Sequence, residues 1–115
     1  MLNHMKKYCL ALDLKDDAQL ISEYEAYHKA VWPEILKSIT DSGITNMEIY
    51  RVANRLFMIM ETTNAFSFEA KATADASNEK EQEWEQLMWK YQQALPTAKE
   101  GEKWMLMEKI FSLNG

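Results

Sequence analysis

The sequence predicts an α+β fold of the ferredoxin-like type, in which the order β-α-β-β-α-β forms an antiparallel four-stranded sheet. Two observations predict it. The spacing of apolar residues changes along the chain from strand alternation to a helical period and back. In addition, two adjacent strand patterns are separated only by Ala-Asn-Arg. With 115 residues, the chain has the length of a single domain, 1–115.

The first half of the chain supplies a strand and a broken helix. Residues 7–14, KYCLALDL, place apolar side chains at every second position, which is typical of a strand with one buried face. Residues 18–42 place apolar side chains three and four apart, which predicts a helix. Pro33 interrupts this pattern, and because proline lacks a backbone donor we expect a break near Val31 and Trp32.

The second half supplies the remaining elements. Residues 44–52 and 56–62 read as a hairpin, residues 65–95 as a helical region in two pieces, and residues 104–113 as the last strand. Both helices would then cover the same face of the sheet. Because the other face also carries apolar side chains, we expect a second copy to cover it, as in a homodimer of the dimeric α/β barrel type.

Composition excludes several function classes. The net charge of −5, from 18 acidic and 13 basic residues without a basic cluster, argues against a nucleic-acid partner. The sequence lacks an apolar run long enough to span a membrane and a signal-peptide pattern at its start, so we expect a cytoplasmic protein. A single cysteine, Cys9, and two histidines, His4 and His28, predict neither a metal site nor a disulfide. With only three glycines, the sequence contains no glycine-rich phosphate loop.

His28 is the candidate catalytic residue. It lies in the stretch EYEAYHKAVWPEI, on the apolar side of the predicted helix. An imidazole with an ordinary pKa of about 6.5 can accept and donate a proton at cellular pH, which suits general acid–base catalysis. Tyr24 lies one turn earlier on the same side and could orient a ligand hydroxyl. The alternative is that His28 is a core residue whose ring nitrogens are satisfied by neighbouring groups.

Four segments together resemble the L-rhamnose mutarotase family: YEAYHKAVWPEI, SGITNMEIYR, LFMIMET and MWKYQQALP. The resemblance extends from Lys7 to Phe111. Its most specific element is His28 followed four residues later by Trp32-Pro33-Glu34. It implies a homodimeric ferredoxin-like barrel that interconverts the α and β anomers of a 6-deoxy sugar without a metal or a cofactor.

The resemblance also implies site residues. The proton donor of the family falls on His28, and a substrate-contacting tyrosine falls on Tyr24. A second binding tyrosine matches Met47, and a Trp-Trp pair matches Met88 and Trp89. Methionine can pack on a sugar ring or a methyl group, but it cannot replace the hydrogen bond of a phenol. These differences leave the reaction in place, with L-rhamnose as the first choice of sugar and L-fucose as the alternative.

The sequence leaves open the identity of the proton acceptor and two alternative functions. The group that accepts the proton from the anomeric hydroxyl could be Asp13, Glu48, Tyr50 or Glu61, all on predicted strands. A cofactor-free monooxygenase and a non-catalytic ligand-binding module are alternative functions, because the same dimeric barrel hosts many activities.

Overall fold

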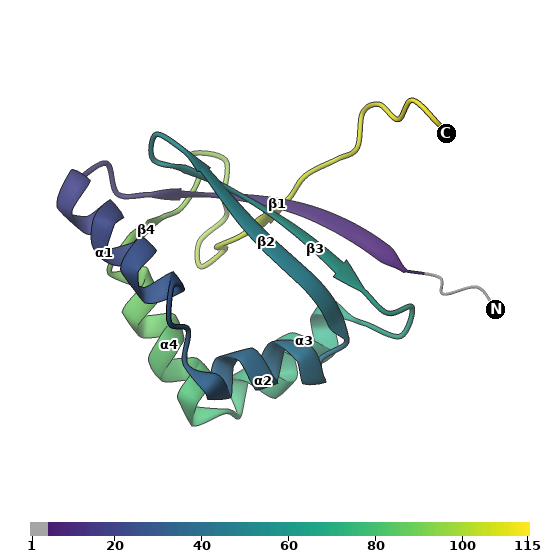
Figure 1. The fold of residues 1–115 in the computed structure, drawn as a ribbon, viewed down its shortest axis with the longest axis horizontal. Helices are drawn as coiled ribbons and strands as arrows, with labels where there is room; N and C mark the ends of the chain where they lie inside the picture. The colour runs from purple at the N-terminus through teal and green to yellow at the C-terminus, as the bar shows by residue number, and fades with distance from the viewer. Residues whose placement is uncertain (1–4) are drawn as a thin grey trace.

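The structure, a computed structural model, describes residues 5–115, and His4 lies outside the described residues. The longest helices have 11 residues, and Figure 1 traces the order of the elements along the chain. Over the described residues, no helix has the length and apolar content needed to cross a bilayer. The elements are β1 (Lys6–Leu14), α1 (Ala18–His28), α2 (Pro33–Asp41), β2 (Ile44–Val52), β3 (Arg55–Thr62), α3 (Phe68–Ala76), α4 (Glu79–Trp89), β4 (Gln92–Gln93) and β5 (Met105–Leu106).

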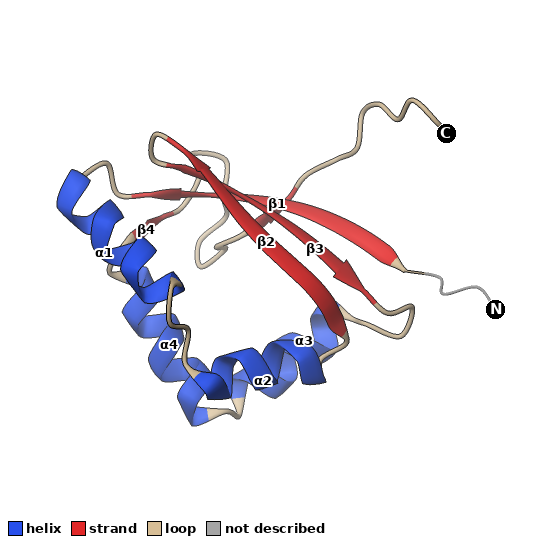
Figure 2. Cartoon of the chain, in the orientation of Figure 1, coloured by secondary structure: helices blue, strands red, loops and turns tan. Residues whose placement is uncertain are grey.

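The strands form one antiparallel sheet with the order β2-β3-β1-β4, and β5 also pairs with β1. The two short strands β4 and β5 therefore share the edge position beside β1 that the predicted last strand would occupy. Figure 2 shows the four helices gathered on one side of the sheet. This arrangement confirms the predicted α+β fold of the ferredoxin-like type.

The predicted break in the first helix is present. Helix α1 ends at His28, and α2 begins at Pro33 with Trp32 in an extended conformation (φ −56°, ψ 136°). Proline disfavours a helical conformation in the residue before it, yet fits the first helical position, where no backbone donor is needed. The break leaves His28 in the last turn of α1, so its ring can turn toward the sheet.

Two predicted element boundaries are wrong. The helical region does not extend to Leu95, because α4 ends at Trp89 and residues 92–93 pair with β1 instead. The last strand does not cover 104–113, because only Met105–Leu106 pairs with β1. The backbone N–H of Met107 still donates to the Cys9 carbonyl at 2.7 Å, and the chain then runs away from the sheet, as Figure 1 shows.

The core lies between the helices and one face of the sheet and consists of two clusters. The cluster nearer α1 and α4 contains the side chains around His28: Leu14, Tyr24, Ile35, Leu56, Trp84, Met88 and Tyr91. The second cluster lies nearer α3 and comprises Leu10, Ile44, Met58, Met60 and Phe66. Strand alternation places the inward-facing residues of β1 and β3 in both clusters, so the sheet forms a continuous floor beneath the helices.

Candidate active site

A pocket of about 160 Å³ between α1 and the hairpin of β2 and β3 contains His28. Its lining, which we call the His28 pocket, consists of Tyr24, Glu25, His28, Lys29, Ile49, Tyr50, Arg51 and Leu56. The structure therefore brings together His28 and Tyr24, the two residues that the sequence predicts one turn apart on one helix face. Apolar, aromatic and charged groups meet here, as expected of a site for a small polar ligand.

The hydrogen bonding of His28 fixes the position of its proton. Its Nδ1 lies 2.9 Å from the backbone carbonyl oxygen of Tyr24. A carbonyl oxygen can only accept a hydrogen bond, so Nδ1 must carry the hydrogen. In the neutral ring, Nε2 then holds a lone pair that is free to accept a proton. Burial lowers the pKa of His28 below its ordinary value, and the hydrogen bond to the Tyr24 carbonyl opposes this shift. The imidazole is therefore neutral at neutral pH.

Aromatic rings hold the imidazole in place. The Tyr24 ring lies 4.3 Å from the His28 ring, measured between centroids, and the Trp84 ring lies 5.7 Å away in an edge-on arrangement. Trp84 also packs edge-on against Trp32 at 5.0 Å, which connects α4 to the linker between α1 and α2. Edge-to-face contacts of this kind have a preferred geometry, so they orient the ring as well as burying it.

A charged pair stands beside the imidazole. Arg51 Nε donates to Glu25 Oε2 at 2.6 Å, and Arg51 Nη1 donates to the backbone carbonyl of Ala53 at 2.7 Å. These bonds tie the guanidinium to α1 on one side and to the hairpin turn on the other. The pair is partly exposed, with the side chains 35% and 48% accessible. Arg51 and Glu25 therefore place a fixed ion pair, with one charge of each sign, in the wall of the His28 pocket.

Tyr24 is held as a neutral phenol. Its side chain is 3% exposed, and burial raises its pKa to about 12, although a hydrogen bond from Gln92 acts in the opposite direction. The amide Nε2 of Gln92 lies 3.4 Å from the Tyr24 hydroxyl. Because a neutral phenol can both donate and accept a hydrogen bond, Tyr24 can donate to a sugar oxygen or accept from a sugar hydroxyl.

The other predicted sugar contacts lie away from the His28 pocket in the described structure. Met88 is 2% exposed and belongs to the core cluster that contains Tyr24. Met47 is partly buried against the second cluster. The ring of Trp89 lies beneath the ammonium of Lys103, 4.9 Å from its centroid. The lining of the pocket includes none of the three predicted contacts, and their contact with a sugar stays a prediction.

The predicted proton acceptors share the opposite face of the sheet. Asp13, Glu48, Tyr50 and Glu61 alternate with the core residues of their strands and so point away from the helices. Asp13 is held there by Arg55, through Nε to Oδ1 at 2.7 Å and Nη2 to Oδ2 at 3.1 Å. Tyr50 does contribute to the pocket lining, but its hydroxyl lies 3.4 Å from Glu48 Oε1 on that opposite face.

Sequence reasoning missed Arg51, Glu25, Trp84 and Gln92 as neighbours of His28 and Tyr24. The spacing of Trp84 on the apolar face of α4 signals burial, but it does not signal which partner it meets. Arg51 shares a strand face with Ile49, which becomes informative only once β2 and β3 are in register. The nearness of these four residues is a product of the tertiary fold.

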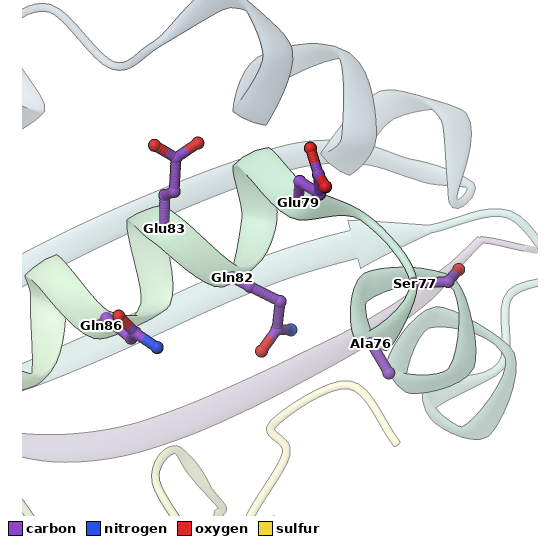
Figure 3. Close-up of a pocket in the computed structure, with 6 residues that line it drawn as sticks. All are labelled: Ala76, Ser77, Glu79, Gln82, Glu83 and Gln86. Atoms are coloured by element: carbon purple, nitrogen blue, oxygen red, sulfur yellow. The ribbon is translucent and has the colours of Figure 1, made fainter.

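A larger depression of about 510 Å³ lies at the junction of α3 and α4 and is lined by Ala76, Ser77, Glu79, Gln82, Glu83 and Gln86. Figure 3 shows that Glu79 and Glu83 point to one side of the helix while Gln82 points to the other. These side chains do not converge on a common point, and the depression lacks a histidine. In residues 5–115, no group of three or more His, Cys, Asp or Glu side chains is placed to hold a metal ion.

Comparison with known proteins agrees with the fold and with the sequence motif. The family model described as L-rhamnose mutarotase matches residues 7–113. An L-fucose mutarotase from Xanthomonas campestris pv. campestris is 44% identical over 112 residues, covering 96% of this chain and 90% of the relative. A crystal structure of an L-rhamnose mutarotase from Formosa agariphila superposes with a TM-score of 0.69 at 19% identity, covering 94% of this chain and 98% of that one. The chain therefore belongs to the L-rhamnose mutarotase family and is an isomerase that acts on carbohydrates.

Proposed function

We propose that this enzyme interconverts the α and β anomers of a 6-deoxyhexose by proton transfer through His28. The observation that carries the proposal is the neutral imidazole in the His28 pocket, whose Nδ1 hydrogen is engaged by the Tyr24 carbonyl, which leaves the lone pair of the ring on Nε2. L-rhamnose is the first choice of substrate, in keeping with the matching family. L-fucose is the alternative, since the relative of 44% identity is an L-fucose mutarotase.

His28 moves one proton between two oxygens of the sugar. Nε2 accepts the proton of the anomeric hydroxyl O1 while the bond between C1 and the ring oxygen O5 breaks. The imidazolium then donates that proton to O5, which leaves an open-chain aldehyde and a hydroxyl. Rotation about C1–C2 presents the other face of the aldehyde, and the same steps in reverse close the ring. Because O1 and O5 are both bonded to C1, one nitrogen can serve both, and His28 remains the proton donor that the resemblance implies.

Two neighbouring groups act on the developing charge. When the C1–O5 bond breaks, negative charge grows on O5, and groups that are already oriented toward it lower the barrier. The Tyr24 phenol stays protonated at neutral pH and can donate to that oxygen. The Arg51 guanidinium, held by Glu25 and by the Ala53 carbonyl, supplies N–H donors and the positive end of an ion pair. Neither group needs to change its protonation state.

The apolar part of the pocket suits a 6-deoxy sugar. Ile49 and Leu56 contribute apolar wall to the His28 pocket. A sugar with a methyl group at C5 can bury that methyl against such a wall, whereas a hydroxymethyl group would lose hydrogen bonds to water there. A single small group of this kind changes discrimination by about 1–3 kcal/mol. The lining therefore favours 6-deoxyhexoses over their 6-hydroxy counterparts.

We also propose that two copies of the chain form a homodimer. The sheet face opposite the helices exposes apolar side chains, among them Tyr50 at 54% and Val52 at 73%. The C-terminal segment beyond β5 exposes Ile110 at 93% and Phe111 at 75%. Large exposed apolar side chains in such number are typical of an interface. We therefore keep the predicted homodimer, with the uncovered sheet face as its contact surface.

Saturation-transfer NMR across matched sugars tests the proposal. L-rhamnose and L-fucose are compared with L-mannose and L-galactose, which differ from them only by a hydroxyl at C6. The anomeric protons report the exchange between the α and β anomers. We expect the enzyme to accelerate this exchange for at least one 6-deoxy sugar, and to accelerate it less for the 6-hydroxy counterpart of that sugar. Equal exchange with and without enzyme for all four sugars would contradict the proposed function.

A further inference from the structure

The side chain of Gln92 has a buried atom that the fold leaves unsatisfied. Gln92 lies opposite Leu14 in the pairing of β4 with β1, and its side chain is 4% exposed. Its Nε2 donates to the Tyr24 hydroxyl at 3.4 Å. Within residues 5–115, its Oε1 is the buried side-chain oxygen or nitrogen that has no hydrogen-bond partner. A buried acceptor without a partner destabilises a fold.

Stability therefore does not explain an amide at this position. An apolar side chain of similar length, such as methionine, would fill the same space without leaving an unpaired oxygen. The one hydrogen bond that the amide makes is to Tyr24, which lines the His28 pocket. The amide is thus in contact with the pocket through the phenol rather than directly.

The two ends of the amide would have opposite effects on the phenol. With Nε2 donating to the Tyr24 oxygen, the phenol keeps its own hydrogen for another acceptor. If the amide turns by half a rotation, Oε1 accepts the phenol hydrogen, and the phenol oxygen offers a lone pair instead. The oxygen and nitrogen ends of an amide are nearly equal in size, so both orientations fit the same space.

In the proposed reaction, the Tyr24 hydroxyl donates a hydrogen bond at one stage and accepts one at another. The ring oxygen O5 bears no hydrogen in the closed sugar and needs a donor, whereas in the open sugar it is a hydroxyl and can donate. We propose that Gln92 is a positioning residue for anomer exchange, setting the direction of the Tyr24 hydroxyl so that it donates to O5 in the closed sugar and accepts from it in the open sugar. This inference rests on the proposed function.

A double-mutant cycle tests it. Gln92→Met and Tyr24→Phe are made singly and together, and Gln93→Met serves as the matched control, because Gln93 is the exposed neighbour on the same strand. The parent and its His28→Asn variant are measured first, so that the proposed function is judged separately. The readout is kcat/KM for anomer exchange on the sugar that the parent prefers, with the melting temperature recorded for every variant.

We expect Gln92→Met to lower kcat/KM about three- to tenfold, the usual worth of one neutral hydrogen bond, without lowering the melting temperature. We expect Gln93→Met to have no effect and Gln92→Met to cause no further loss in the Tyr24→Phe background, as coupled residues require. An equal loss in both backgrounds, or no loss in either, would overturn the inference while leaving an active parent as support for the function. An inactive parent would overturn both.

Discussion

Replacement of His28 by asparagine separates catalysis from packing. The side-chain amide of asparagine can place a donor near the position of the imidazole Nδ1, so it can keep the hydrogen bond to the Tyr24 carbonyl, which is 2.9 Å long in the parent. Asparagine has no atom at the position of Nε2 and no group that titrates near neutral pH. The substitution therefore removes proton transfer and leaves the local hydrogen bond in place.

The expected loss of rate follows from the role of the imidazole. General acid–base catalysis contributes about a hundredfold to ten-thousandfold, which corresponds to about 2.7–5.5 kcal/mol in the activation free energy. The cost in stability is smaller, because the half-buried ring gives up its contacts with Tyr24 and Trp84 but the hydrogen bond remains. We expect the free energy of unfolding to fall by about 1 kcal/mol, which lowers the melting temperature by a few degrees.

Anomer-exchange NMR and thermal denaturation measure the two quantities on the same samples. His28→Ala is the matched comparison, because it removes the hydrogen bond as well as the imidazole. It should lose the same rate as His28→Asn and a further 1 kcal/mol or so of stability. A His28→Asn variant that melts early, and yet exchanges anomers at the parent rate while folded, would contradict a catalytic role for His28. His28 would then be a core residue whose ring nitrogens are satisfied by the fold.

Four further predictions concern pH, sugar choice, core packing and assembly. Because burial lowers the pKa of His28, kcat/KM should be flat near neutral pH and fall about tenfold per unit as the pH drops below that pKa; a rate that rises toward acid would show that the imidazolium starts the reaction. Met47→Tyr should change the ratio of L-rhamnose to L-fucose rates if Met47 contacts the sugar, and an unchanged ratio would exclude that contact. Met88→Trp should lower the free energy of unfolding by about 1–3 kcal/mol, because Met88 is 2% exposed in the core, and an unchanged denaturation curve would contradict this packing. Sedimentation at micromolar concentration should report twice the 13.5 kDa chain mass, and a monomer would refute the proposed dimer.

The fold could be predicted from the sequence where the conformational preference of individual residues agrees with the tertiary packing. Pro33 breaks the first helix by its own stereochemistry, so the break could be placed from the sequence. Gln92 and Gln93 form a strand for a different reason. The Tyr91 carbonyl accepts a hydrogen bond from Lys15 N–H at 2.8 Å, which brings the following residues to the edge of β1. Two glutamines show no alternation that would predict such pairing.

The same distinction applies to the site. His28 and Tyr24 are one turn apart on one helix, so their proximity follows from helix geometry alone. Trp84 and Arg51 come from α4 and β2, and their approach to His28 depends on how the helices lie over the sheet. Residues that meet only through tertiary packing leave no periodic signal in the sequence, which is why the Arg51–Glu25 ion pair in the pocket wall was not predicted.

The central claim is that His28 carries a proton between O1 and O5 of the sugar. A single crystalline anomer of the preferred sugar, freshly dissolved in buffer near neutral pH, gives the most direct measurement. The approach to the anomeric equilibrium is followed by NMR with the parent, with His28→Asn at equal concentration, and without enzyme. We expect a fast approach to equilibrium with the parent. With His28→Asn, we expect the acceleration above the rate in buffer alone to be at least about a hundredfold smaller than with the parent. Equal acceleration by the parent and by His28→Asn would contradict it.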